Sequence, residues 1–206
     1  HHMDSWGRSD LLLGQICNMP YRALFRDRVT VLGCGDYGLP ETPPGYYHSV
    51  FVTRVEDSAT SLDQALTGRL AYSEELSQSG WGAVHDFAAA RGIALTPHLQ
   101  TGAHVDSARA VARGAADVAS IDAITWRMLE QWLPEAAGLR VIGRSQATPG
   151  QSFVTARSND TEPIRAALHE AITALPDESR DRLGLRGFVT HPESAYDFPI
   201  APPPAT

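Results

Sequence analysis

The sequence contains no lysine, so all 17 of its basic residues are arginines. Aspartate and glutamate together number 24, which gives a formal net charge of −7 at pH 7. A protein that binds nucleic acid or an anionic membrane surface needs a clustered basic face. We therefore expect neither nucleic acid nor an anionic membrane as a partner of this chain.

Long hydrophobic runs are also absent. The first apolar run, Leu11-Leu12-Leu13, is far shorter than the roughly 20 residues that a membrane-spanning helix needs. Hydrophobic residues make up 43% of the chain and charged residues 20%, which is the composition of an ordinary globular protein. A chain of 206 residues is long enough to bury a core.

Cysteine is scarce, since only Cys17 and Cys34 occur. Two cysteines cannot form a structural zinc site or a disulfide framework. A single bridge between them and a pair of buried free thiols both stay open, and the free thiols are the simpler expectation. Residues 1–3 are interpreted as the remnant of an expression tag and are set aside.

Glycine and proline divide the chain into short apolar runs that alternate with amphipathic segments of helical length, a pattern typical of an α/β protein. The alternation is regular over residues 55–143, which we predict to be one lobe. The flanking residues, 4–54 and 144–206, are predicted to form a discontinuous first lobe. Two crossings of the chain between lobes predict a cleft of the kind in which ligands bind.

Three strand-to-helix turns fall within the predicted central lobe. The expected strands cover residues 69–73, 93–99 and 117–121, and the helices that follow them cover residues 81–91, 104–113 and 123–132. If these strands are parallel, their helix N-termini converge at one edge of the sheet. The proline-rich tail from His191 is expected to lie on the surface without regular structure.

The run Ser77-Gln78-Ser79-Gly80 is the most distinctive of these turns. Hydroxyl groups, backbone N–H groups and the positive end of a helix favour binding of an anion. The run is not the phosphate-binding P-loop of nucleoside triphosphatases, because it lacks the glycine spacing and the lysine. A simple role for Ser77 or Ser79 as a helix cap is the alternative.

His104 and Asp122 occupy the other two turns. His104 could donate a hydrogen bond to a ligand, or it could be an ordinary surface or capping residue. Asp122 could accept a hydrogen bond from an amine or a protonated oxygen of a ligand, or it could cap the helix that it precedes. From the other lobe, Gln15, Tyr21 and Tyr47 are candidates because they lie near the ends of predicted strands.

Five segments carry a resemblance to a known family. They are LLLGQICNMPY, YYHSVFVTR, SLDQALTGRLAYSEELSQSGW, TGAHVDSARAVARGAADVASIDAITW and LRVIGRSQATPGQSFVT. In this order and spacing they resemble the phosphate-, phosphite- and phosphonate-type substrate-binding proteins of ABC transporters. The resemblance extends from about Asp10 to Phe188 and depends on the whole series, since no single motif is specific.

The resemblance implies a two-lobed type II periplasmic binding fold that holds a small anionic ligand between its lobes, without cofactor, metal or catalytic residue. Ligand-binding positions of the family fall on Tyr47, Ser77, Gln78, Ser79, His104 and Asp122. The family usually has threonine where this chain has Gln78, so an amide replaces one hydroxyl donor. The family's first lobe also begins with a strand–helix–strand portion that is not found before Leu11.

The resemblance further implies a permease partner and a periplasmic or lipid-anchored extracytoplasmic location. No signal peptide is visible, so a cytoplasmic sensor or accessory protein with the same cleft is an alternative. A hydrolase that uses a serine of the turn with His104 and Asp122 is a second alternative. The nucleophile-elbow pattern G-x-S-x-G is missing around these serines, which argues against the hydrolase.

Overall fold

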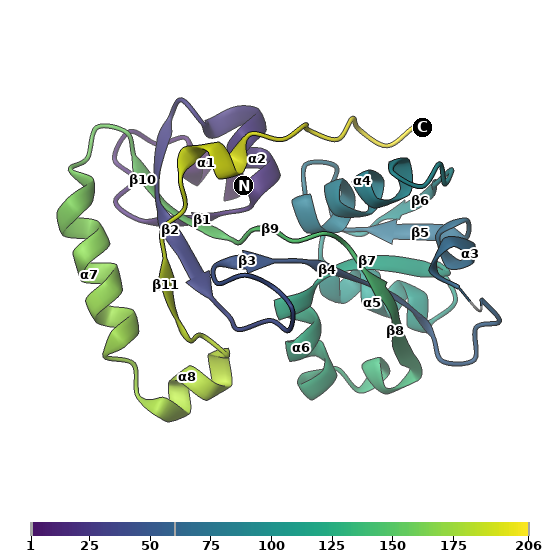
Figure 1. Ribbon diagram of the computed structural model, residues 1–206. Coiled ribbons are helices and arrows are strands. Elements are labelled where there is room, and N and C mark those ends of the chain that lie inside the picture. Colours follow the sequence, from purple (N-terminus) through teal and green to yellow (C-terminus); the bar gives the residue numbers. More distant parts are fainter. Residues whose placement is uncertain (1, 60, 206) are drawn as a thin grey trace. The chain divides into compact units, whose positions relative to one another are not determined.

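The structure, a computed structural model, describes residues 2–59 and 61–205 and is shown in Figure 1. The chain forms two compact units. Unit 1 comprises His1–Tyr47 and Thr148–Ile200, and unit 2 comprises His48–Ala147 and Ala201–Thr206. The chain therefore passes from one unit to the other three times, where the sequence predicted two crossings.

Unit 1 is built on a four-stranded sheet in the order β1-β10-β2-β11. Its strands are β1 (Gly14–Ile16), β2 (Val29–Asp36), β10 (Ser152–Ala156) and β11 (Gly187–Val189). Each pair of neighbours in this sheet is antiparallel. Strands β3 (Tyr46–Tyr47) and β9 (Thr148–Pro149) form a separate short antiparallel pair. They lie at the end of the first segment of unit 1 and at the start of the second.

The helices of unit 1 pack around a small apolar core. They are α1 (His2–Trp6), α2 (Asn18–Pro20) with a π turn (Tyr21–Phe25), α7 (Thr161–Thr173), α8 (Asp177–Leu183) and a 3-10 turn (Glu193–Tyr196). The core includes Ile16, Phe25 and Tyr196, and Met3 and Trp6 pack against it. Met3, which was assigned to a tag remnant, thus contributes to packing.

Unit 2 contains a five-stranded sheet in the order β6-β5-β7-β4-β8. Its strands are β4 (Ser49–Arg54), β5 (Arg69–Tyr72), β6 (Thr96–Gln100), β7 (Val118–Asp122) and β8 (Leu139–Arg144). Strand β5 is parallel to both β6 and β7, whereas β4 is antiparallel to β7 and β8. The carboxyl ends of β5, β6 and β7 therefore lie at one edge of the sheet, as the candidate site requires.

Both faces of this sheet carry helices. The elements are α3 (Leu62–Leu66), a π turn (Gln78–Gly82) that continues into α4 (Ala83–Ala89), α5 (His104–Ala112), α6 (Ala123–Trp132) and a 3-10 turn (Pro134–Gly138). Helix α4 connects β5 to β6 in one direction along the sheet, and α5 connects β6 to β7 in the other. Because such connections are right-handed, α4 and α5 lie on opposite faces, as Figure 1 shows. No helix among the described residues is long and apolar enough to cross a membrane.

The unit boundaries correct the expected lobe boundaries near residues 54 and 144. Strands β4 and β8, which flank the predicted central lobe, are both paired within the sheet of unit 2. The tail is corrected as well, because residues 193–196 form a 3-10 turn and residues 201–205 belong to unit 2. A prediction based on local alternation cannot place β4 and β8, since their membership is decided by pairing partners distant in the sequence.

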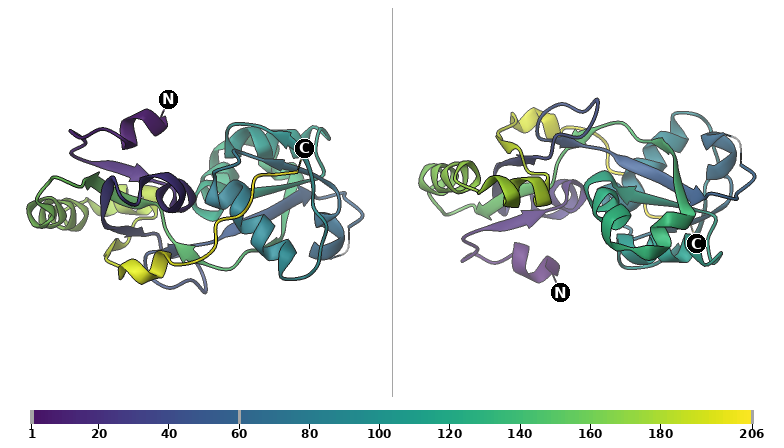
Figure 2. Two further views of the ribbon diagram at one scale, coloured as in Figure 1. Left: turned by 90° about the horizontal axis from the view of Figure 1, so that it is seen from above. Right: turned by 90° about the horizontal axis from the view of Figure 1, so that it is seen from below.

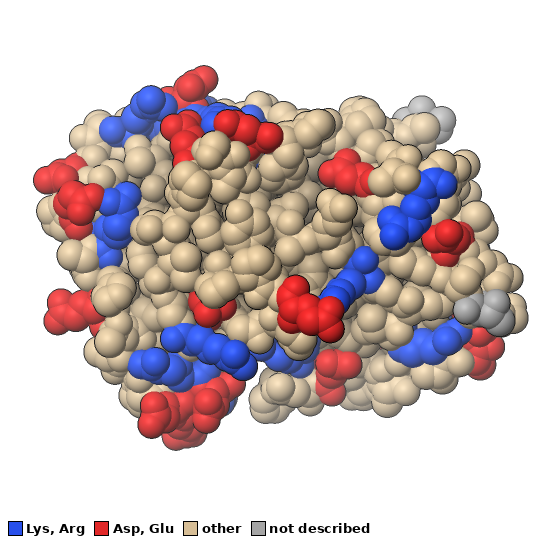
Figure 3. Space-filling view, viewed as in Figure 1, with Lys and Arg blue, Asp and Glu red and all other residues tan. Residues whose placement is uncertain are grey.

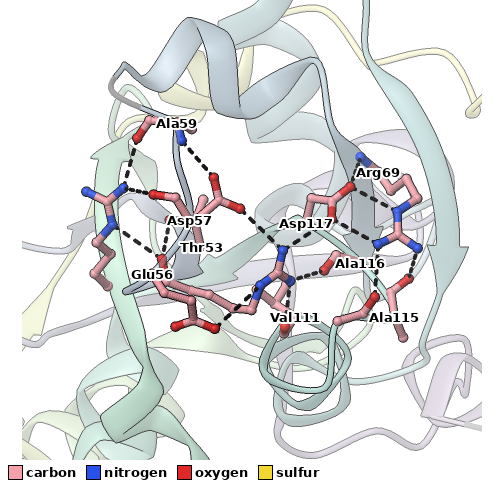
Figure 4. A network of polar contacts seen from close by, with 12 residues as sticks. Thr53, Glu56, Asp57, Ala59, Arg69, Val111, Ala115, Ala116 and Asp117 are labelled. Atoms are coloured by element: carbon pink, nitrogen blue, oxygen red, sulfur yellow. Dashed lines mark hydrogen bonds and ion pairs between the residues drawn. The ribbon is translucent and has the colours of Figure 1, made fainter.

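An arginine–aspartate network holds the edge of the sheet at which β5 and β7 begin (Figure 4). Arg69 donates hydrogen bonds from Nε and Nη2 to the two carboxylate oxygens of Asp117, each at 2.9 Å. Arg54 donates to the carbonyls of Val111 and Ala116 at 3.0 and 2.8 Å. The Arg69 guanidinium holds the pKa of Asp117 well below its usual range. This network fixes the strands at the edge away from the candidate site.

Arginine and acidic side chains are interspersed on the face shown in Figure 3. Ion pairs of the chain include Arg26 with Asp197 at 2.6 Å and Arg109 with Asp106 at 3.2 Å. On this face the positive charge is divided into small clusters that lie beside carboxylates. This face therefore offers no broad positive field to an anion.

Candidate functional site

The serine turn, residues 77–80, begins the helix that continues as α4. Ser77 has extended backbone angles, and its Oγ accepts a hydrogen bond from the N–H of Gly80 at 3.0 Å. Ser77 is thus the N-cap of this helix. A Cβ atom on Gly80 would lie 2.2 Å from Ser73 Oγ, so only glycine allows the turn to approach the end of β5 this closely.

The backbone carbonyl of Ser79 is hydrogen-bonded to two central strands of the sheet. Its carbonyl oxygen accepts hydrogen bonds from Ser49 Oγ at 3.0 Å and from Ser120 Oγ at 2.6 Å. Ser49 begins β4 and Ser120 lies in β7, and all three residues are buried. Two adjacent strands therefore fix the position of the serine turn, which leaves the hydroxyl of Ser79 free to bond elsewhere.

The side chain of Ser79 meets His104, the first residue of α5. The distance from Ser79 Oγ to His104 Nε2 is 2.9 Å. Gly102, with φ of +84°, makes the turn ahead of α5, and its N–H donates to the carbonyl of Ser73 at 2.8 Å. Burial lowers the pKa of His104, and the negative charge of Asp122 and the nearby backbone of Ser120 oppose this shift. The imidazole is accordingly neutral at neutral pH.

Asp122 lies at the end of β7 and caps α6. Its Oδ1 accepts a hydrogen bond from the N–H of Thr125 at 2.8 Å. The other oxygen, Oδ2, and His104 Nδ1 are both buried without a hydrogen-bond partner among the described residues. A buried polar atom without a partner is costly. These two atoms therefore indicate a place where water or a ligand completes the hydrogen bonding.

The same geometry weighs against a Ser-His-Asp hydrolase. Ser79 and His104 are within hydrogen-bond distance, as a nucleophile and its base would be. In such a triad the second ring nitrogen of the histidine is held by the carboxylate. Here His104 Nδ1 makes no hydrogen bond within the described part of the chain, and Asp122 uses Oδ1 as a helix cap. The histidine is not oriented by Asp122 as a catalytic base requires.

The structure brings five of the eight candidate residues to one edge of the sheet of unit 2, namely Ser77, Gln78, Ser79, His104 and Asp122. Gln78 is buried. The other three candidates, Gln15, Tyr21 and Tyr47, belong to unit 1. The ring of Tyr21 packs edge-on against Tyr196 at 5.2 Å in the core, and Gln15 is exposed. Ligand contacts by these three residues stay a prediction.

Ser49 and Ser120 were not among the predicted residues. Each is a serine within an otherwise apolar strand, in the runs Ser49-Val50-Phe51-Val52 and Val118-Ala119-Ser120-Ile121. A hydroxyl at a fully buried strand position needs a partner, and this signal could have identified them. Their partner, the carbonyl of Ser79, could not be read from the sequence because it lies on another element.

No group of three or more metal-binding side chains occurs in residues 2–59 or 61–205. Such a group would consist of histidine, cysteine, aspartate or glutamate. The donor set at the serine turn is made of hydroxyl, imidazole and backbone N–H groups, with a single carboxylate. This set suits an anion with a protonated oxygen or an amine better than it suits a cation.

Comparison with known proteins places the chain in a family. The family model described as "ABC transporter, phosphonate, periplasmic substrate-binding protein" matches residues 14–196. No curated protein matches the sequence. The family consists of substrate-binding proteins and not of enzymes, so the expectation of a binding protein is confirmed.

Three solved structures illustrate the fold. PhnD1 from Prochlorococcus marinus, in complex with methylphosphonate, has a TM-score of 0.72 at 15% identity over 95% of this chain and 79% of its own. A binding component of a phosphonate ABC transporter from Pseudomonas aeruginosa has a TM-score of 0.72 at 16% identity. The match covers 95% of this chain and 69% of its own. A Xanthomonas citri protein bound to ATP has a TM-score of 0.70 at 18% identity. The match covers 94% of this chain and 77% of its own.

These likenesses confirm the α/β class and the type II periplasmic binding fold that the sequence predicted. The match to the family model covers most of the chain and includes every turn of the candidate site. The chain belongs to the family of periplasmic phosphonate-type substrate-binding proteins of ABC transporters.

Proposed function

We propose that this chain is the solute-binding component of an ABC importer and that it binds a small oxyanion of the phosphonate, phosphite or phosphate class at the serine turn. One observation carries the proposal. The hydrogen-bonded pair Ser79 and His104 lies at two helix starts, beside two buried atoms that lack partners, His104 Nδ1 and Asp122 Oδ2. Membership in the phosphonate-binding family supports the same ligand class.

The two unpartnered atoms suggest complementary roles. A neutral His104 that accepts the Ser79 proton at Nε2 carries its own proton on Nδ1, which can be donated to a ligand oxygen. Asp122 Oδ2 can only accept, so the ligand must offer it a proton on an oxygen or an ammonium group. A fully deprotonated anion such as sulfate would instead place negative charge against the carboxylate, and we expect it to be rejected.

Titration calorimetry tests this proposal. Methylphosphonate, phosphite, phosphate and sulfate are titrated into the intact protein at neutral pH. We expect at least one of the first three to bind, and sulfate to bind much more weakly. The Ser79→Ala variant should lose affinity, whereas Ser158→Ala, a matched change at an exposed serine of unit 1, should not. Equal affinity of Ser79→Ala and the unmodified protein would contradict the proposed site.

The transport role is part of the same proposal. The family implies a permease partner and an extracytoplasmic location. A sensor or accessory protein with the same site, cytoplasmic or not, would bind the same ligands without a permease. Ligand uptake by vesicles that contain the cognate permease and transport ATPase, measured with and without this protein, separates the two roles.

A further inference from the structure

A buried arginine of unit 1 binds the C-terminal tail at residues 198 and 199. Arg22 donates hydrogen bonds from Nη1 to the carbonyls of Phe198 and Pro199 at 2.6 and 2.8 Å. Its guanidinium also lies over the ring of Phe198, 3.7 Å from the centroid. The tail therefore leaves unit 1 from a fixed point, and residues 197–205 have no regular secondary structure, as the sequence predicted.

Beyond Ile200 the tail belongs to unit 2, where a tryptophan holds it. Trp81 Nε1 donates a hydrogen bond to the carbonyl of Pro202 at 2.6 Å, and the indole is 3% exposed. The left view of Figure 2 shows the yellow end of the chain running over the surface of unit 2. The prolines lack N–H groups and have a restricted φ angle, so this segment loses little entropy when it docks.

The docked tail borders an apolar hollow of about 270 Å³. The hollow is lined by Trp81, His85, Ala88, Ile93, Leu95 and Pro97 on one side and by Pro202 and Pro203 on the other. An extended proline segment against an aromatic and aliphatic surface is a recurrent mode of peptide recognition. Here the segment and the surface belong to the same chain.

Trp81 is also part of the π turn that carries the serine turn. Its N–H and that of Gly82 both donate to the carbonyl of Ser77 at 3.0 Å. The indole packs between Tyr72, with centroids 5.5 Å apart, and His85, with centroids 5.7 Å apart. A π turn is a rare departure from α-helical geometry and is frequent at functional sites. The bond from Trp81 to Pro202 is a tertiary contact made by this turn.

We propose that the docked tail is a positioning element for the serine turn. By holding the indole of Trp81, residues 201–205 stabilise the π turn and so fix the hydroxyl of Ser79 and the neighbouring N–H groups. Without the tail, the indole N–H turns to water and the turn can relax toward α geometry. The effect on ligand affinity rests on the proposed function, whereas the effect on the turn does not.

The experiment compares the full chain with a chain that ends at Ile200. Amide hydrogen exchange of residues 78–89 is measured without ligand, and methylphosphonate affinity is measured by calorimetry. We expect faster exchange in the shortened chain and a loss of affinity of about 3- to 10-fold, the size that one lost hydrogen bond produces. A chain that ends at Ala205, which keeps Pro202 and its bond to Trp81, should behave like the full chain.

A second variant makes the test independent of the deletion. Trp81→Phe keeps a ring but removes the N–H donor, and it should also accelerate exchange of residues 78–89 and weaken binding. Trp132→Phe, at a tryptophan of α6 that is 74% exposed, is the matched control and should change neither. Thermal unfolding of each variant confirms that it is folded before exchange is compared.

Two results would overturn the proposal. One is unchanged exchange of residues 78–89 in the chain that ends at Ile200. The other is accelerated exchange with unchanged methylphosphonate affinity, which would show a tail that stabilises the helix without positioning the ligand groups. If the full chain binds none of the anions, the proposed function fails, and exchange alone then decides whether the tail positions the turn.

Discussion

Ser79 Oγ and His104 Nε2 lie 2.9 Å apart, although the two residues are separated by 25 positions in the sequence. The contact joins the helix that follows β5 to the helix that follows β6. Each helix start would offer only its own N–H groups if it stood alone. Together they form a site with a hydroxyl, an imidazole and two helix N-termini at one edge of a parallel group of strands.

The two serines of the turn should respond differently to substitution. Ser79→Ala removes the hydroxyl that keeps the proton of His104 on Nδ1; losing that hydrogen bond to a charged ligand, worth roughly 1.5–3 kcal/mol, should weaken binding by about 10- to 150-fold. Ser77→Ala removes a helix cap and should lower the free energy of unfolding by about 1 kcal/mol, with the smaller effect on affinity. Calorimetry and urea unfolding of both variants measure the two effects. The reverse ranking in affinity would mean that Ser77 is the ligand donor.

Protonation of His104 should affect stability at acidic pH. Burial lowers the pKa of His104 in the folded state, so below its unfolded value of 6.5 the unfolded chain binds more protons. Stability from this residue is therefore complete above pH 6.5 and falls as the pH drops through that value. The His104→Gln variant should lose less stability than the unmodified protein between about pH 7.5 and pH 5.5. If the free energy of urea unfolding fell equally with pH in the unmodified protein and in His104→Gln, this prediction would be wrong.

The same residue predicts a pH dependence of binding. A bound anion favours the protonated imidazole, which makes a stronger, charge-assisted hydrogen bond. The affinity ratio between the unmodified protein and His104→Ala should therefore rise as the pH falls below neutral. The ratio cancels the ligand's own titration, since both proteins are measured with the same ligand at each pH. A ratio that is constant across this range would exclude a direct contact between His104 and the anion.

Asp117 should stabilise unit 2 at pH values above the pKa that this residue has in the unfolded chain. Arg69 holds the pKa of Asp117 well below its usual value, so the contribution is present above about pH 4 and is lost as the pH falls further. Asp117→Asn should lower the free energy of unfolding at neutral pH by about 1–2 kcal/mol. Asp63→Asn, at an exposed residue 3.9 Å from Arg91, is the control and should have little effect. The difference between the two variants should disappear in acid.

Cys17 and Cys34 are thiols and form no disulfide with each other in the structure, with Cys34 buried and Cys17 partly exposed. Burial raises the pKa of the Cys34 thiol, and its sulfur lies 3.4 Å from Ser152 Oγ. A thiol reagent should modify Cys17 alone in the native protein and both cysteines in denaturant. Detection of no thiol in denaturant would show that the two cysteines are bridged.

The sequence by itself determined the local elements of unit 2 well. Helix α6 spans residues 123–132 as predicted, and α5 begins at His104 as predicted. Helix α6 has strong boundary signals in the cap Asp122 and the terminating Pro134, and α5 is followed by Gly114 with φ of +72°; these signals act within a few residues of the chain. The order of the three strand-to-helix turns, and so the candidate residues of unit 2, followed from these signals.

Only the tertiary structure decided which elements became partners. The predicted strand at residues 93–99 begins later, at Thr96, and Ile93 and Leu95 instead line the hollow beside the C-terminal tail. Apolar patterning reports that a side chain is buried but not what buries it. The bonds of Ser49 and Ser120 to the carbonyl of Ser79, and of Trp81 to Pro202, likewise join positions far apart in the sequence. Such contacts depend on the register and topology of the folded sheet, which local propensities do not encode.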